Sequence, residues 1–213
     1  MSASDSHTSS VSASRNRTHK LTVTAMLSAV AFILMFIEFP IPALIPSFVK
    51  MDVSDLPELL AAFSLGPIYG VAVTFLKNLL HIVFKGTSSA YVGELCNFLL
   101  GAVFSLAAGF IYQRKKSRKS ALVGAIIGAA LMAIVSVPLN YFVVYPAYVV
   151  FYGLPMDQII GMYQAILPGV NGLFACLTIL NLPFTFCKGL LDAIICFFIY
   201  KPLSPILHKT GKK

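Results

Sequence analysis

The sequence predicts an all-α membrane protein with six transmembrane helices that are joined in part by long outer loops. Of its 213 residues, 58% are hydrophobic and 11% are charged, and the mean hydropathy is +0.84. Soluble domains carry about 25% charged residues, so this composition excludes an ordinary soluble domain. The apolar residues also fall into long runs that polar segments separate, which is typical of membrane-spanning helices.

The six expected helices cover residues 20–39, 54–65, 66–84, 91–112, 121–145 and 182–200. A spanning helix needs about 20 apolar residues, and the second of these segments is shorter than that. It follows an acidic stretch that contains Asp55 and Pro57, and Gly66 and Pro67 separate it from the third segment.

Basic residues gather in three clusters, each beside an apolar run, and these clusters set the expected orientation. They are Arg15/Arg17/Lys20, residues 114–119 and residues 209–213. Cytoplasmic segments next to spanning helices carry an excess of Lys and Arg, and six spans place all three clusters on one side. We therefore expect both termini to be cytoplasmic, and the net charge of +8 to reflect topology rather than a nucleic-acid partner.

The chain is expected to form one membrane domain with two tails. Residues 1–19 are rich in Ser and Thr and lack an apolar core, so a disordered cytoplasmic tail is expected there. Residues 20–207 form the six-helix domain in this interpretation, and residues 208–213 form a basic cytoplasmic tail.

Two connections on the outer side, residues 40–53 and 146–181, are too apolar and aromatic to be solvated linkers. The second is expected to hold a short interfacial helix near residues 156–167. Long loops of this kind beside a membrane domain are candidate lids over a ligand site.

Polar residues inside the predicted spans point to a cavity. They are Lys77, Asn78 and His81; Glu94 and Asn97; Asn140; and Thr185, Lys188 and Asp192, with Asn181 just before them. Such groups are costly in lipid and usually face a cavity or a partner. Most of them fall in the outer half of the predicted bundle, which indicates a pocket beneath the outer loops.

Other roles remain open for several of these residues. Lys77 could extend its amine outward along its apolar stem, and His81 is expected at the interface rather than as a ligand. Lys188 and Asp192 could neutralise each other as an i,i+4 pair. Glu94 lies near a helix start, where the helix dipole favours an anion.

The sequence contains no pattern for catalysis or metal binding. A phosphate-binding loop, an HExxH motif and a nucleophile elbow are all missing, so this chain is not expected to hydrolyse ATP or to act as an enzyme. The four cysteines lie in or beside apolar stretches without metal-site spacing, which is typical of small packing residues.

Four long motifs carry a family resemblance. They are KMDVSDLPELLAAFSLGPIYG at 50–70, LKNLLHIVFKGTSSAYVGELCNFLLG at 76–101, PLNYFVVYPAY at 138–148 and LPFTFCKGLLD at 182–192. With these motifs in this order, the chain from about Leu21 to Tyr200 resembles the riboflavin-binding substrate (S) components of energy-coupling factor (ECF) transporters.

This resemblance implies a six-helix subunit of the bacterial cell membrane that captures riboflavin, or FMN, from outside with high affinity. It implies partners: a transmembrane coupling subunit and two cytoplasmic ATPases. No cofactor is expected besides the transported ligand. Family pocket residues match Glu94, Asn97, Asn140 and Lys188, whereas Thr185 stands where the family often has Asn.

The remaining site residues come from position in the chain. Lys77 and Asn78 join the expected substrate site because they lie among the polar residues of the third span. The small residues Ala25 and Ala29 match the motif by which the family contacts its coupling subunit.

Riboflavin has a flat apolar ring system with a polar edge, and needs aromatic walls with a few donors and acceptors. Phe39, Phe48, Tyr141 and Tyr145 are expected to supply such walls. Two other functions remain open: an S component for another vitamin, and a solitary ion-coupled transporter that uses Glu94, Lys188 and Asp192. An intramembrane enzyme acting on a lipid is the weakest alternative, because no catalytic constellation is present.

Overall fold

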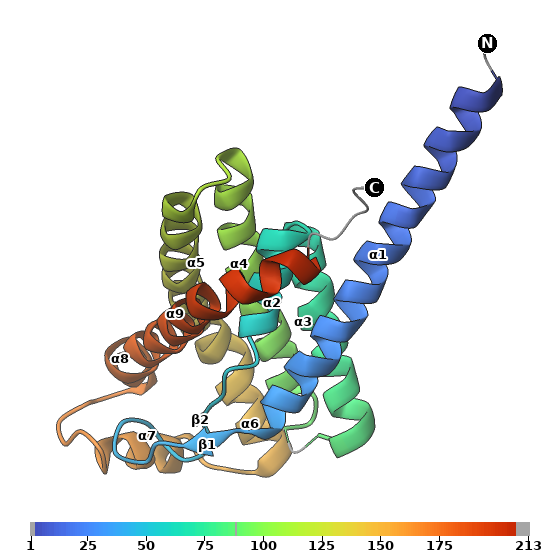
Figure 1. Cartoon of the computed structure of the whole chain (residues 1–213). Helices are drawn as coiled ribbons and strands as arrows, with labels where there is room; N and C mark the ends of the chain where they lie inside the picture. Colours follow the sequence, from blue (N-terminus) through green and yellow to red (C-terminus); the bar gives the residue numbers. More distant parts are fainter. Residues whose placement is uncertain (1–2, 88, 208–213) are drawn as a thin grey trace.

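The computed structural model describes residues 3–87 and 89–207, and nearly all of its regular structure is helical (Figure 1). The elements in order are α1 (Ala3–Phe36), β1 (Phe39–Pro40), β2 (Lys50–Met51), α2 (Leu56–Ser64), α3 (Pro67–Lys85), α4 (Val92–Arg114), α5 (Arg118–Leu139), the π-helix η1 (Asn140–Val144), α6 (Tyr145–Tyr152), α7 (Met156–Gln164), α8 (Leu173–Cys176), the π-helix η2 (Leu177–Asn181) and α9 (Leu182–Leu207). The predicted all-α membrane class is confirmed.

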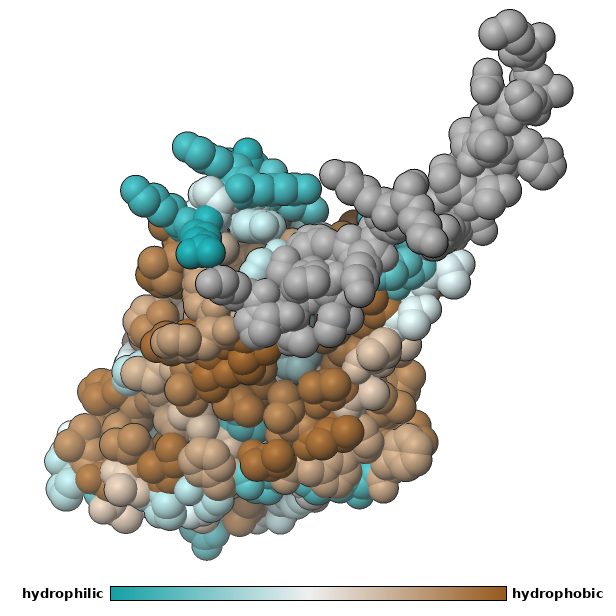
Figure 2. Space-filling view, viewed as in Figure 1, coloured by the Kyte–Doolittle hydropathy of each residue, from teal (hydrophilic) through white to brown (hydrophobic). Residues whose placement is uncertain are grey.

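Five helical segments of the described chain are long and apolar enough to cross a membrane. They are Asn16–Phe36, Pro67–Lys85, Val92–Arg114, Arg118–Tyr152 and Leu173–Tyr200. Figure 2 shows the corresponding belt of hydrophobic side chains between more hydrophilic ends. The predicted count of six spanning helices is therefore too high by one.

The exception is α2, which replaces the second predicted span. Its nine residues extend only about 14 Å, against a hydrocarbon core of about 30 Å. All of them except Ser64 are buried, so α2 is an internal helix that packs against α1, α3, α4 and α9. The sequence could not distinguish these two possibilities for α2, because a short apolar segment has the same composition in a membrane span and in a buried internal helix.

The two ends of the bundle have different contents (Figure 1). The start of α1, the α4–α5 connection and the end of α9 lie toward one end, whereas the β1–β2 hairpin, α6 and α7 lie toward the other. In the hairpin the strands are antiparallel, with Phe39 opposite Met51 and Pro40 opposite Lys50.

Helix α1 is longer than the sequence predicts. It begins at Ala3, so residues 3–19, which the sequence predicts to be a disordered tail, are helical and project beyond the bundle in Figure 1. Once a helix is nucleated, each further residue adds one backbone hydrogen bond, so the helix of the membrane span can extend toward the N-terminus. The predicted basic tail at 208–213 lies outside the described residues.

Two helices are broken by π-helical turns where the sequence predicts the edges of the second outer loop. The turn η1 joins α5 to α6, and η2 joins α8 to α9. A proline follows each turn by two residues, Pro146 and Pro183, and its missing N–H would interrupt a regular α-helical ladder. The predicted loop 146–181 is thus helical at both ends, with α7 close to the expected interfacial helix.

Close helix packing explains one pair of glycines. A Cβ at Gly124 would lie 2.7 Å from the carbonyl oxygen of Ala108, and one at Gly128 would lie 2.9 Å from that of Phe104. These glycines therefore let α5 approach the backbone of α4, as small residues at four-residue spacing do between membrane helices.

Candidate substrate-binding site

A cavity of ≈ 420 Å³ lies between the β1–β2 hairpin, the α3–α4 turn and the two broken helices. Small-molecule sites usually have about 300–1,000 Å³, so its size suits a ligand larger than a single ion. Of the residues predicted to bind a substrate, Glu94, Asn97, Asn140, Thr185 and Lys188 line this cavity. The structure brings these five together from three segments, and their role in binding stays a prediction.

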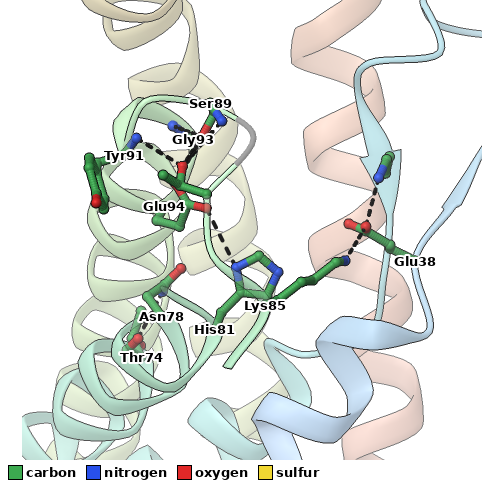
Figure 3. Close-up of polar contacts among 11 residues, drawn as sticks. Glu38, Thr74, Asn78, His81, Lys85, Ser89, Tyr91, Gly93 and Glu94 are labelled. Atoms are coloured by element: carbon green, nitrogen blue, oxygen red, sulfur yellow. Dashed lines mark hydrogen bonds and ion pairs between the residues drawn. The ribbon is translucent and has the colours of Figure 1, made fainter. Parts of the chain in front are cut away.

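Glu94 is held at one wall by the turn between α3 and α4 (Figure 3). Its Oε2 accepts hydrogen bonds from the hydroxyls of Thr87 and Ser89, at 3.0 and 2.8 Å. Its Oε1 lies 3.5 Å from Nδ1 of His81. Because Glu94 is 6% exposed, these contacts fix a carboxylate that can accept a hydrogen bond from a ligand.

The exposed rim of the cavity carries an ion-pair network that joins three elements. Oε1 of Glu38, just after α1, lies 2.6 Å from Nζ of Lys50 on β2 and 2.7 Å from Nζ of Lys85 at the end of α3 (Figure 3). Partial burial raises the pKa of Glu38, but hydrogen bonds from both lysines outweigh this effect, so its net pKa lies below the ordinary value. At neutral pH Glu38 is therefore ionised and ties the hairpin to α3.

On the inner wall, Lys188 is paired with acidic residues from the segment before α2. Its Nζ lies 3.2 Å from Oδ2 of Asp52 and 3.1 Å from Oδ2 of Asp55. The open alternative from the sequence, an ion pair between Lys188 and Asp192, is not what the described residues form. Lys188 is 13% exposed at its side chain, so its amine is shared between the cavity and these two carboxylates.

Lys77 and Asn78, which the sequence places in the substrate site, do not line the cavity. The Lys77 side chain is fully buried and does not extend to the interface. Its Nζ lies 2.6 Å from Asp55, 2.5 Å from Glu58 and 2.8 Å from the hydroxyl of Ser54. Asn78 donates to the backbone oxygen of Thr74 within α3. Lys77 therefore contacts α2, whereas Asn78 bonds within its own helix, because α2 packs where a cavity was expected.

Asp192 is fully buried, and neither of its carboxylate oxygens has a hydrogen-bond partner among the described residues. A buried carboxylate without hydrogen bonds destabilises a fold. We expect Asp192→Asn to raise the free energy of unfolding by about 1 kcal/mol, measured as a higher thermal midpoint in detergent. Asp157→Asn, at an exposed position of α7, is the control and should leave the midpoint unchanged; a lower midpoint for Asp192→Asn would contradict this account.

Aromatic side chains line part of the cavity, but not all those expected. Phe48 and Tyr145 line it, and Tyr148 joins them. Phe39 and Tyr141 do not line it and are 50% and 37% exposed. Phe48 packs edge-on against Tyr145 and Tyr148, so an aromatic cluster forms part of the cavity wall.

The sequence missed several residues of the cavity wall. His81, Asn181, Asp52, Asp55, Thr87 and Ser89 all line it. His81 and Asn181 belong to the polar set that the sequence identified, so the signal was present for these two. Asp52, Thr87 and Ser89 lie in connections between predicted spans, where no helical spacing indicates depth. Asp55 lies at the start of the second predicted span and belongs to the acidic stretch that begins this helix.

The fold and the cavity define an integral membrane protein that encloses a polar, small-molecule-sized site in its helical bundle. The family described as "ECF transporter, substrate-specific component" matches residues 19–200. The chain belongs to this family of substrate-specific components of ECF transporters.

Named relatives agree with this assignment. The chain is 40% identical over 190 residues to "Riboflavin transporter RibU" of Staphylococcus aureus, covering 89% of this chain and 93% of the relative. It is 33% identical over 191 residues to "Riboflavin transporter FmnP" of Bacillus subtilis, covering 89% and 94%. A solved structure described as "Structure and mechanism of the S component of a bacterial ECF transporter" superposes with a TM-score of 0.68 at 36% identity, over 91% of this chain and 99% of that one.

Proposed function

We propose that this protein captures riboflavin, or FMN, from outside the cell and delivers it inward as the substrate-binding subunit of an ATP-driven ECF transporter. One observation supports this function most directly: the four residues that match the family pocket converge, together with Thr185, on a single ≈ 420 Å³ cavity. The similarity to riboflavin transporters of two bacteria supports the choice of ligand.

The cavity offers the chemistry that riboflavin requires. Phe48, Tyr145 and Tyr148 form an apolar wall for the ring system. Lys188 donates to a ring carbonyl, and Asn140 can both donate and accept at the polar edge. Glu94 accepts from a ring N–H or from a hydroxyl of the ribityl chain, since its own contacts hold it at the wall.

The test of the ligand is the visible spectrum of the protein purified in detergent. A yellow preparation that shows flavin bands and releases riboflavin on denaturation would establish the ligand. Titration of ligand-free protein against riboflavin fluorescence would then give the dissociation constant, with FMN measured in parallel. A colourless protein that fails to quench riboflavin fluorescence would overturn the assignment and leave another vitamin as the ligand.

We propose the orientation and the partners on separate grounds. Both tails and the 114–119 segment are basic, which favours a cytoplasmic location for that end in a bacterial cell membrane. The chain carries no ATP-binding motif, so the driving energy comes from two partner ATPases through a transmembrane coupling subunit.

The coupling subunit is proposed to contact α1 at Ala25 and Ala29, which are exposed on the same face. Ala29→Phe is expected to block riboflavin uptake in cells that contain the coupling subunit and ATPases, because a bulky ring prevents close helix contact. Riboflavin binding by the purified variant should be unchanged. Ile134→Phe, at an exposed site on α5, is the control and should retain uptake; loss of binding in Ala29→Phe would count against this contact.

A further inference from the structure

Three buried side chains form a hydrogen-bonded ring behind the cavity. Tyr145 begins α6, Tyr163 lies on α7 and Asn181 ends η2, and their exposed fractions are 1%, 0% and 4%. The hydroxyls of Tyr145 and Tyr163 are in hydrogen-bond contact. Tyr163 donates to Oδ1 of Asn181 at 2.7 Å, and Nδ2 of Asn181 lies 3.4 Å from the Tyr145 hydroxyl.

The number of protons fixes the direction of this ring. Each phenol has one O–H, and that of Tyr163 is used on Asn181. Tyr145 must therefore donate to Tyr163, while its oxygen accepts from the Asn181 amide. Burial raises the pKa of Tyr163, so its hydroxyl keeps this proton throughout the neutral range.

The ring leaves one donor unused. The amide of Asn181 has two N–H groups, of which the ring takes one. Asn181 and Tyr145 line the cavity, whereas Tyr163 does not. Tyr163 occupies one lone pair of the Asn181 carbonyl oxygen and Tyr145 accepts one of its N–H groups, so the second N–H is the donor that Asn181 can offer to a bound molecule.

We infer that Asn181 is a further ligand-contacting residue that donates a hydrogen bond to an acceptor of the substrate, and that Tyr163 is a positioning residue that holds its amide. This inference rests on the proposed function. It makes α7 part of the binding machinery, since a helix outside the cavity wall sets the orientation of a group within it. Because the amide is already held in its binding orientation, no further side-chain conformational entropy is lost there when the ligand binds.

The test is a double-variant cycle on riboflavin affinity. Asn181→Ala should weaken binding by at least about tenfold, and Tyr163→Phe by about fivefold, because one hydrogen bond is lost or misdirected in each. In the Asn181→Ala background, Tyr163→Phe should change the affinity by less than about twofold. The visible absorption band of bound riboflavin should also shift in Asn181→Ala, if a donor to the ring is removed.

Tyr112→Phe is the matched control. Tyr112 and Tyr200 are also joined by a side-chain hydrogen bond, but neither lines the cavity, so this variant should keep the wild-type affinity. An unchanged affinity in Asn181→Ala would overturn the contact, even if Tyr163→Phe did not fold. Additive effects of the two variants would overturn the positioning role. A wild-type protein that binds no riboflavin would instead overturn the proposed function.

Discussion

Replacing Lys188 by methionine is expected to weaken riboflavin binding by at least about 30-fold. Its ammonium is the donor shared between the cavity and the carboxylates of Asp52 and Asp55. Removing it deletes a charge-assisted contact with the ligand. It also takes one positive charge away from the carboxylates of Asp52 and Asp55, which then repel the ring carbonyls of a ligand. Truncation of one partner in a buried charge pair typically costs 2–5 kcal/mol, and this corresponds to at least about 30-fold in affinity.

The measurement is fluorescence titration with riboflavin, together with the thermal midpoint of the ligand-free variant. Lys85→Met is the matched control, because Lys85 lines the same cavity at its exposed rim, where an ion pair contributes less than about 1 kcal/mol. Its affinity should fall by less than about fivefold. Equal losses of riboflavin affinity in the two variants would show that Lys188 acts through the electrostatic potential of the cavity and not through a direct contact with the ligand.

Lys77→Met is expected to lower the free energy of unfolding by about 3–5 kcal/mol, because it leaves the buried carboxylate of Glu58 without its partner and Asp55 with Lys188 alone. Asp55 and Glu58 are 3% and 0% exposed and lie at 2.6 and 2.5 Å from the Lys77 amine. The check is the thermal midpoint in detergent and the yield of folded protein. The double variant Lys77→Met/Glu58→Leu should recover part of the loss, since an apolar replacement of both partners is far less costly.

This prediction also separates the two roles considered for Lys77. The sequence assigns it to substrate binding, whereas the structure places it against α2 and outside the cavity. A Lys77→Met protein with wild-type stability but no affinity for riboflavin would favour the first role. A variant that is unstable, yet binds riboflavin in its folded fraction, would favour the second.

The sequence predicted the depth of the polar residues better than their direction. Glu94, Asn140 and Lys188, which the sequence places at one depth in the predicted bundle, all line the cavity, because depth follows from counting residues at about 1.5 Å each. The rotation of each helix about its axis depends on its neighbours. On α3, His81 therefore reaches the cavity while Lys77, one turn away, faces α2.

The contacts made by residues in irregular segments of the backbone were the hardest to predict. Asp52 and Asp55 lie in the segment that leads into α2, and their pairing with Lys188 joins positions more than 130 residues apart in the chain, as the separation of 136 between Asp52 and Lys188 shows. No periodicity links such positions. Asn97 and Asn140 stand out in the sequence as polar residues within predicted spans and also match the family pocket, but only the structure could add the ring around Asn181.

The two π-turns make the register of the following helices sensitive to chain length. A π-turn contains one residue more than an α-turn, and one residue corresponds to about 100° of helix rotation. Deleting a single residue within η2 would restore a regular ladder there, yet it would swing the face of α9 that carries Thr185 and Lys188 away from the cavity. A one-residue deletion at this point would therefore alter the binding site even where every pocket residue type is retained.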